Sequence, residues 1–471
     1  MWSEPSGTRS EGPPISQGAI GETPARLASS GGSTPFRHRD GVFDQPRAQT
    51  FAVIGLLPTY TACIPNRAKG NVMAIFKDEM FEAQWLRAAG HASYDAAEIA
   101  ECLEVARQIG GGDPERWFAA WSGFASRLFA AAEHSELAGH SASARGAYLR
   151  ASNYWRAAWT FLFQAPIEAR ALDAYRRHRE AFTRAAKLMS PAGEAIRIPY
   201  EGKFLHGYFF KAAADGLPRK TLIVNGGYDS TAEEAFLFSG AAALARGYNA
   251  LLFDGPGQGA AIFEDGLVFR PDWEKVIGPV VDYLFTRPEV DRRRVALMGV
   301  SFGGYLAPRA ASFEPRLAAL IADPGQLSLF EEMKSRLPPF AARRLMDREG
   351  LVSRLLEFAL SRRLRHVSQG WALRRGLLVH GLKTPIDYLR LTADYVTERP
   401  EAIRCPTVIC SAENDEIGKT ARDLYDRLTC HKIFLAFKAS EGAGEHCESG
   451  ARAWFNQRVL DWLDETLAEI A

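Results

Sequence analysis

The sequence predicts an α/β fold in which a mainly parallel sheet is covered by helices on both faces and is preceded by a helical domain. From residue 196 onward, short apolar runs alternate with helical stretches, as in parallel strands joined by helical crossovers. Over residues 76–189 the apolar residues recur instead at helical spacing. We therefore expect a helical cap domain over residues 73–190 and a sheet domain over residues 191–471.

The composition argues against several classes of protein. The 471 residues are 47% hydrophobic and 24% charged, and the formal net charge of +1 gives no general attraction to nucleic acid or to a membrane surface. The six cysteines show no C-x-x-C spacing, which favours free thiols in a reducing compartment over a metal site. The first 49 residues lack the apolar core of a signal peptide. We expect a cytoplasmic protein with no metal or other cofactor, and no nucleic-acid or membrane partner.

The chain begins with a segment of low complexity. Residues 1–50 are rich in Gly, Ser, Pro and Arg and have no periodicity, so we interpret residues 1–72 as a disordered N-terminal arm. In the helical region that follows, Trp117 and Trp121 are four residues apart and share one helix face.

The strands of the sheet domain are read from its apolar runs. Residues 196–200 and 204–210 flank Glu201-Gly202-Lys203, which predicts a hairpin. The later runs are residues 221–224, 250–253, 295–298, 318–321, 407–410 and 433–436. Residues 327–401 interrupt the alternation with a helical, basic stretch containing 14 Lys and Arg against 9 Asp and Glu. We interpret it as a helical lid inserted between two strands.

Gly299-Val300-Ser301-Phe302-Gly303 lies between a predicted strand and a predicted helix. In that context G-x-S-x-G is typical of a nucleophile elbow, a turn so sharp that only small residues fit on either side of the serine. We predict that Ser301 is a nucleophile.

A serine nucleophile needs a histidine base and an acid that orients it, in the chain order Ser, acid, His for this type of elbow. Asp415 follows the strand at 407–410 and is our candidate acid, with Glu413 as the alternative. His446 lies in a Gly-rich loop after the last strand and is our candidate base. His431 is less suitable because it starts a strand, at the wrong end of the sheet.

Acyl transfer also needs donors for the oxyanion of the tetrahedral intermediate. One predicted donor is the backbone N–H of Phe302. The other comes from the Asn-Gly-Gly-Tyr loop after the strand at 221–224, as the N–H of Tyr228 or Gly227. Asp323 ends a strand near the site, and Glu332 follows in the lid, so both are candidates for contact with substrate.

Several segments together resemble one family. They are residues 138–155, NGGYDSTAEE at 225–234, DGPGQG at 254–259, GVSFGGY at 299–305 and GAGEH at 442–446. The chain resembles, over roughly residues 75–471, the α/β-hydrolases with an N-terminal helical domain. That group includes 2,6-dihydroxypseudooxynicotine hydrolase and the fungal polyketide-shortening hydrolases of the yellowish-green pigment type.

The resemblance implies a function. Known members hydrolyse a carbon–carbon bond beside a carbonyl, with the active site between the helical domain and the hydrolase core. It implies a triad of Ser301, Asp415 and His446, a substrate-binding role for Glu332, and a homodimer. The expected substrate is a small carbonyl compound such as a β-diketone or an acyl-aromatic, polyketide-like molecule. A carboxylesterase of the same fold uses the same first steps and is the alternative, and a non-catalytic binding protein of this fold is a second alternative, from another class.

Overall fold

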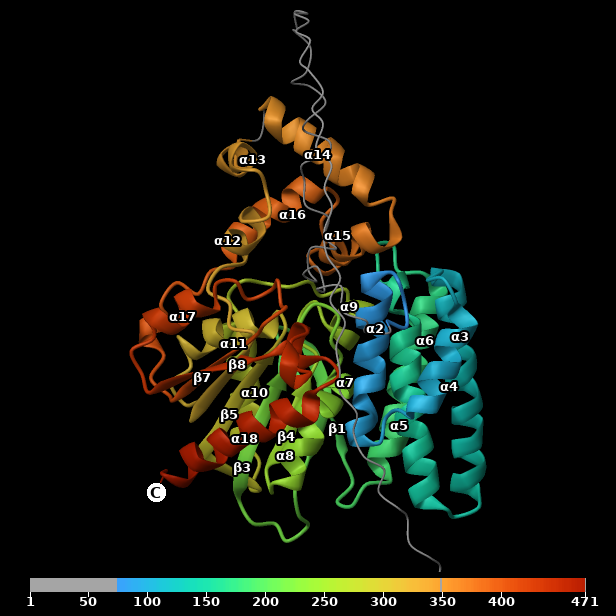
Figure 1. Cartoon of the computed structure of the whole chain (residues 1–471). Coiled ribbons are helices and arrows are strands. Elements are labelled where there is room, and N and C mark those ends of the chain that lie inside the picture. Colours follow the sequence, from blue (N-terminus) through green and yellow to red (C-terminus); the bar gives the residue numbers. More distant parts are fainter. Residues whose placement is uncertain (1–73, 348–349, 471) are drawn as a thin grey trace, which may run out of the picture. The chain divides into compact units, whose positions relative to one another are not determined.

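The computed structural model describes residues 74–347 and 350–470. The predicted disordered arm at 1–72 lies outside the described residues. Within these residues, a run of helices is followed, from near residue 190, by strands that alternate with helices, as the sequence predicted (Figure 1).

The described residues form an eight-stranded sheet with the strand order β1-β2-β4-β3-β5-β6-β7-β8. The strands β1 and β2 form the predicted antiparallel hairpin, β2 is antiparallel to β4, and the remaining pairs are parallel. All six later apolar runs are strands. The bounds are β1 Glu194–Tyr200, β2 Lys203–Phe210, β3 Arg219–Asn225, β4 Asn249–Phe253, β5 Val290–Val300, β6 Ala319–Asp323, β7 Thr407–Ala412 and β8 Lys432–Phe437.

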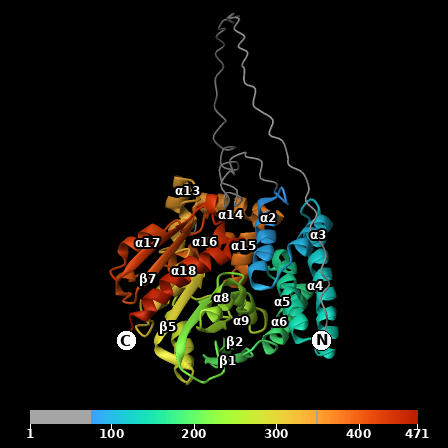
Figure 2. The same ribbon diagram turned by 60° about the horizontal axis from the view of Figure 1, so that its bottom comes forward.

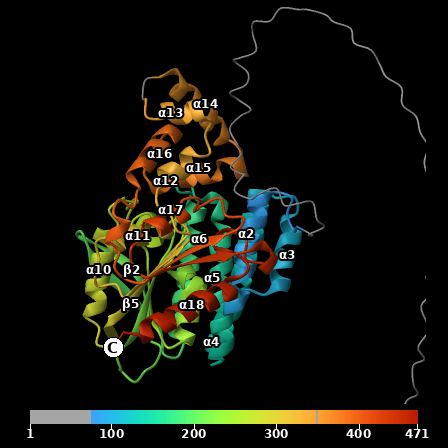
Figure 3. The same cartoon turned by 60° about the vertical axis from the view of Figure 1, so that its left-hand side comes forward.

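The sheet is buried on both faces. In β3, Ile223 belongs to one hydrophobic cluster, whereas its neighbours Leu222 and Val224 belong to the other, because successive side chains point to opposite faces. Helices α10 and α11 cover the first face and α18 covers the second (Figure 3). The helices of the sheet domain are α7 Ala232–Ala235, η4 Phe236–Gly240, α8 Ala241–Ala245, α9 Gly259–Phe263, α10 Glu274–Phe285, α11 Gly303–Ala311, α17 Ala421–Arg427, η7 Ala439–Glu441, η8 His446–Glu448 and α18 Arg452–Ala468.

The helices before the sheet pack side by side (Figure 2). The helix α4 begins where the sequence provides both start signals, with Pro114 in its first turn and the Asp113 carboxylate accepting the Arg116 N–H at 2.9 Å. Trp117 and Trp121 are fully buried on one face of α4. These helices are α2 Glu79–Gly90, η2 His91–Tyr94, α3 Ile99–Ile109, α4 Pro114–Leu137, α5 Ser141–Ala158, η3 Thr160–Leu162 and α6 Ala169–Lys187.

The predicted insertion between β6 and β7 is helical (Figure 1). The Trp371 indole on α15 donates a hydrogen bond to the Thr160 carbonyl at 2.9 Å, which ties the insertion to the helices before the sheet. Among the described residues, no helix has the length and apolarity needed to cross a bilayer. The helices of the insertion are α12 Leu329–Lys334, α13 Pro339–Arg344, α14 Leu351–Arg363, α15 Val367–Val379, α16 Pro385–Leu391, η5 Thr392–Asp394 and η6 Pro400–Ala402.

Candidate active site

Ser301 lies in a sharp turn between the end of β5 and the start of α11. Its φ of 61° is in the left-handed region, which is uncommon for a residue other than glycine. The glycines around it leave room for this turn. A Cβ at Gly299 would collide with the Gly303 carbonyl oxygen, and a Cβ at Gly303 with the Asn225 carbonyl oxygen. The turn therefore requires small residues at both positions.

The structure brings the three predicted triad residues together. A hydrogen bond of 2.9 Å joins Ser301 Oγ to His446 Nε2, and one of 2.7 Å joins His446 Nδ1 to Asp415 Oδ2. Asp415 follows β7, and His446 lies between β8 and α18. Of the alternatives, Glu413 is exposed and accepts the Ala439 N–H, and His431 is exposed just before β8 begins. The arrangement has the connectivity of a nucleophile, a base and an orienting acid.

The surroundings of the His446 imidazole favour its protonated form. Burial lowers its pKa, but the neighbouring Asp415 carboxylate outweighs burial, and the net pKa is raised above the ordinary 6.5. A raised pKa favours the imidazolium that forms when a base accepts a proton from serine.

Cys447, beside the imidazole, is a buried thiol. Its Sγ lies 3.5 Å from His446 Nε2, and burial raises the pKa of the thiol well above its usual value. A thiol with a raised pKa stays protonated at neutral pH, so Cys447 acts as a packing group there. Within residues 74–347 and 350–470, no group of three or more His, Cys, Asp or Glu side chains is arranged to hold a metal ion.

The loop after β3 packs directly against the elbow. A Cβ at Gly227 would lie 2.7 Å from Ser301 Cβ and 2.8 Å from the Phe302 nitrogen, so the Gly227 backbone touches both residues. The Gly227 N–H, however, donates to Ser230 Oγ at 2.7 Å. This contact argues against Gly227 as the oxyanion donor, because its proton is already engaged. The backbone N–H groups of Phe302 and Tyr228 therefore remain the predicted pair of oxyanion donors.

This loop, residues 225–229, is named the oxyanion loop for its predicted role. It is held from two directions. The Gln258 amide, in the turn after β4, donates to the carbonyl oxygens of Gly226 at 2.6 Å and Gly227 at 3.1 Å. On the lid side, the Tyr228 hydroxyl lies 3.0 Å from His380 Nε2 and 3.1 Å from the Tyr388 hydroxyl. Burial lowers the pKa of His380 to about 3, so this imidazole is neutral. His380 is thus a neutral link between the lid and this loop.

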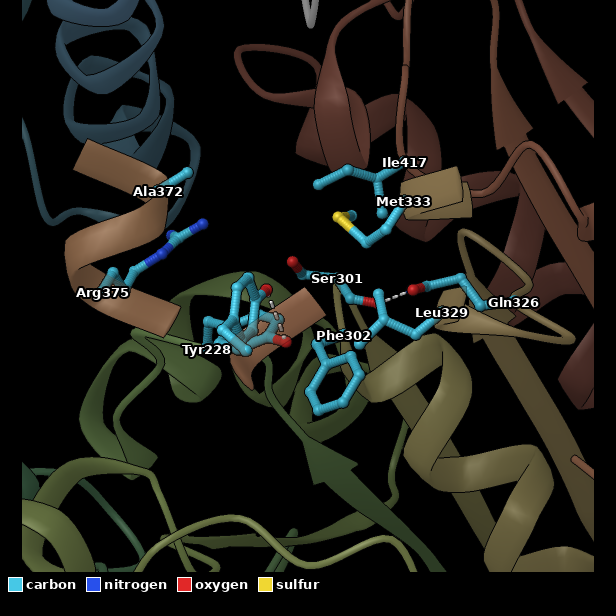
Figure 4. Close-up of a pocket in the computed structure, with 10 residues that line it drawn as sticks. Tyr228, Ser301, Phe302, Gln326, Leu329, Met333, Ala372, Arg375 and Ile417 are labelled. Carbon is cyan, nitrogen blue, oxygen red and sulfur yellow. Dashed lines mark hydrogen bonds between the residues drawn. The ribbon is translucent and has the colours of Figure 1, made fainter. Parts of the chain in front are cut away.

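Ser301 lines two cavities. The smaller has room for about one or two water molecules; it lies under the lid and has Tyr228, Phe302, Met333 and other side chains in its wall (Figure 4). The larger has several times more room and extends past His446 to helix α2. Most of the exposed lining area in both is apolar. The serine thus lies where two mainly apolar pockets meet, and the larger one offers more room for an organic group.

The two predicted substrate-contact carboxyls do not line either cavity. Asp323 is 1% exposed and pairs with the Arg452 guanidinium at 3.1 Å. Glu332 is fully buried, and one of its oxygens accepts the Thr420 hydroxyl at 2.9 Å. Burial raises the pKa of Glu332 to about 7. Sequence position brought both residues to the correct end of the sheet, but their side chains turn into the protein, where Arg452 binds Asp323 and Thr420 binds one oxygen of Glu332.

A buried ionic cluster beside the site was not anticipated. Asp229, in the oxyanion loop, pairs at 3.0 Å with Arg87 of α2 and with Arg156 of α5, and at 3.2 Å with Arg375 of α15. Arg87 and Arg156 also pair with Glu234. The sequence held one signal, a single arginine in the otherwise apolar run WRAAW at 155–159. The members of the cluster come from four segments that are far apart in the chain, those of Arg87, Arg156, Asp229 with Glu234, and Arg375.

Comparison with known proteins identifies similar chains. The sequence model described as "Alpha/beta hydrolase family" matches residues 204–451. Over 416 residues the chain is 33% identical to "Hydrolase LUC6" of Fusarium sp, covering 83% of this chain and 97% of that protein. Over 418 residues it is 34% identical to "20-hydroxy-prefusarin hydrolase FUS2" of Gibberella moniliformis, covering 84% and 98%. The solved structure of 2,6-dihydroxy-pseudo-oxynicotine hydrolase has a similar fold, with a TM-score of 0.63, 24% identity, and coverage of 80% of this chain and 95% of that one.

Proposed function

This chain belongs to the alpha/beta hydrolase family and is a hydrolase, and from that premise we propose that it is a serine hydrolase that cleaves a carbon–carbon bond next to a carbonyl. The observation that carries the serine mechanism is the hydrogen-bond chain from Ser301 through His446 to Asp415. Ser301 lies where two mainly apolar cavities meet, and such cavities suit an organic substrate.

In the proposed reaction, Ser301 Oγ attacks the substrate carbonyl carbon while His446 Nε2 takes the hydroxyl proton. The Asp415 carboxylate stabilises the imidazolium and fixes the tautomer. The backbone N–H groups of Phe302 and Tyr228 donate to the oxyanion. Collapse of the tetrahedral intermediate breaks the bond to the leaving group, which receives the proton from His446. Water, activated by the same imidazole, then hydrolyses the acyl-serine.

The choice of a carbon–carbon bond rests on the family resemblance of the motifs quoted above. The name of the relative 20-hydroxy-prefusarin hydrolase supports a small organic substrate. A carboxylesterase would use the same residues with an alkoxide as the leaving group, so only the reaction itself separates the two.

The proposal is tested with the purified full chain, an aryl β-diketone such as 1-phenylbutane-1,3-dione, and an aryl ester such as 4-nitrophenyl butanoate. Diketone cleavage by the wild type that falls at least about 10,000-fold in Ser301→Ala supports the proposal. Ester turnover alone would make the protein a carboxylesterase. Equal rates in the wild type and Ser301→Ala would overturn the serine mechanism.

A further inference from the structure

Arg375 is a charged residue in the wall of both cavities that meet at Ser301. It lies on α15, one turn after Trp371, and its guanidinium stacks 4.0 Å from the centre of the Trp371 ring. The Tyr228 ring lies 5.5 Å from the guanidinium on the oxyanion side. In Figure 4 the Arg375 side chain extends from α15 toward the space in front of Ser301.

The donors of Arg375 are poorly satisfied. The side chain is 13% exposed, and its one ion pair among the described residues is to Asp229 Oδ1, at 3.2 Å. The Nε–H is buried and has no hydrogen-bond partner. A guanidinium carries five N–H donors, and buried donors are nearly always paired in folded proteins. Because Arg375 lines both cavities and has one ion pair for its five donors, it has donors left for an acceptor that enters with a ligand.

The ionic cluster around Arg375 has more positive than negative charge. Burial raises the pKa values of the Asp229 and Glu234 carboxyls, but the arginines outweigh burial and hold both pKa values below the usual range. Both carboxyls are therefore ionised at neutral pH. These two negative charges face three guanidiniums, those of Arg87, Arg156 and Arg375, so the cluster carries a surplus of one positive charge beside the cavity.

Two other carboxylates line the larger cavity. Asp415 accepts from His446 Nδ1, and Glu445 accepts from the Asn414 amide at 3.4 Å. Neither is the ion-pair partner of Arg375, which is Asp229, and Arg375 is the cluster arginine that lines both cavities, where it can meet a negatively charged group of the substrate.

Resting on the serine mechanism proposed above, we propose that Arg375 binds the enolate oxygen of the leaving group, and that the substrate carries a second carbonyl β to the scissile one. When the carbon–carbon bond breaks, its electron pair goes to the α-carbon and delocalises onto the oxygen of this second carbonyl. Arg375 donates to that oxygen as the charge develops. The His446 imidazolium then delivers its proton to the α-carbon, which yields the ketone and leaves the acyl group on Ser301.

This assignment gives Arg375 a role that depends on the bond cleaved. The leaving oxygen of an ester is bonded to the acyl carbon itself, so its charge develops beside His446 and not on an oxygen three bonds from the scissile carbonyl carbon. The charge on an enolate oxygen exists mainly in the transition state and product. Removal of the Arg375 guanidinium should therefore lower kcat more than it raises KM. A permanently charged substrate carboxylate would instead be bound in the ground state, and its loss would appear in KM.

The kinetic test compares Arg375→Met and Arg375→Lys with the wild type on 1-phenylbutane-1,3-dione and 4-nitrophenyl butanoate. We expect kcat for the diketone to fall about 100-fold in Arg375→Met, the usual cost of one oxyanion donor, with partial recovery in Arg375→Lys. Ester turnover falls less than about fivefold. Equal losses on the two substrates, or a change confined to KM, overturn the proposal.

The matched control is Arg374→Met, one residue earlier on the same helix. The Arg374 guanidinium donates to the backbone carbonyls of Leu364, His366 and Val367 and lines neither cavity. We expect this variant to keep the wild-type ratio of diketone to ester turnover. A ratio that falls as far as in Arg375→Met would attribute the effect to general damage to the lid and overturn the proposal.

A binding arm needs no turnover and so separates this inference from the proposed function. The probe is 5,5-dimethylcyclohexane-1,3-dione, which is an enolate at neutral pH, and its neutral methyl enol ether is the matched ligand. We expect calorimetry to show that Ser301→Ala binds the enolate at least about tenfold more tightly than the ether. The preference should disappear in Ser301→Ala/Arg375→Met and persist in Ser301→Ala/Arg374→Met. Equal affinities in Ser301→Ala, or a preference retained without Arg375, overturn the proposal even if the wild type cleaves diketones.

Discussion

Replacing Gly227 with alanine tests whether the oxyanion loop must touch the elbow. The added Cβ would lie 2.7 Å from Ser301 Cβ, 2.8 Å from the Phe302 nitrogen and 2.9 Å from Ser301 Oγ. Carbon atoms in contact normally lie about 3.5 to 4.0 Å apart, so the loop must retreat by roughly 1 Å. Gly227 has no positive φ in the structure, so the expected effect comes from space and not from backbone conformation.

The retreat should affect activity more than stability. Overpacking a buried site costs about 1 to 3 kcal/mol, which a chain of this size tolerates. The same movement separates the backbone donors of Tyr228 and Phe302, and the loss of one oxyanion donor costs about 100- to 1,000-fold in kcat. We therefore expect a folded protein with kcat lowered by at least about 100-fold.

The assay measures kcat and KM on the substrate that the wild type turns over, together with urea unfolding. Gly123→Ala is the matched control, because Gly123 lies within α4 and nothing lies within 4 Å of its added Cβ. This variant should keep full activity and gain up to about 1 kcal/mol of stability from helix propensity. Full activity in Gly227→Ala would refute the close contact between the loop and the elbow.

Three further variants probe the charges of the site. The kcat/KM of the wild type should rise with pH through a midpoint above 6.5, the ordinary pKa of histidine, because His446 must be neutral to act as a base and its pKa is raised. In Asp415→Asn the midpoint should move down and kcat should fall about 10,000-fold; a pH profile with an unmoved midpoint would contradict this cause. Burial raises the pKa of Glu332 to about 7. Between pH 4.5 and 7 the folded protein therefore holds a proton that the unfolded chain has released. The free energy of unfolding should fall by about 3 kcal/mol as the pH rises through this range. Glu332→Gln should remove that decline in urea unfolding at pH 5 and pH 8, and an unchanged decline would show that another group causes it. Asp229→Asn leaves three arginines facing one carboxylate and should cost about 3 to 5 kcal/mol in the same measurement, whereas an unchanged midpoint would argue against the ionic cluster.

The parts of the fold that follow from local patterns were predictable. Each predicted apolar run is a strand, because a run of buried residues bounded by turn residues is a property of neighbouring residues alone. The elbow around Ser301 was predictable for the same reason, since the glycines that make the turn possible adjoin the serine. Asp415 and His446 were found from chain order, and the structure brings them within hydrogen-bond distance of one another and of Ser301.

The hydrogen-bond partners of individual polar groups were not predictable, even within one loop. The donor role assigned to Gly227 overlooked Ser230, whose hydroxyl oxygen accepts the hydrogen bond of that N–H. The substrate contacts assigned to Asp323 and Glu332 followed from position along the chain, but the direction of each side chain depends on Arg452 and Thr420, more than 80 residues away in sequence.

The sequence alone determined the alternation of strands and helices and the sharp turn at Ser301, because hydrophobic period and turn chemistry act between adjacent residues. The homodimer, the cytoplasmic location and the domain bounds read from it stay predictions. Tertiary structure decided which charges meet. Arg375 and Asp229 lie 146 positions apart, and their pairing beside Ser301 depends on how the lid and the β3 loop pack together. A burial pattern records that a residue is buried but not which partner it meets, and here that pairing places Arg375 and Asp229 together in the wall of the larger cavity at Ser301.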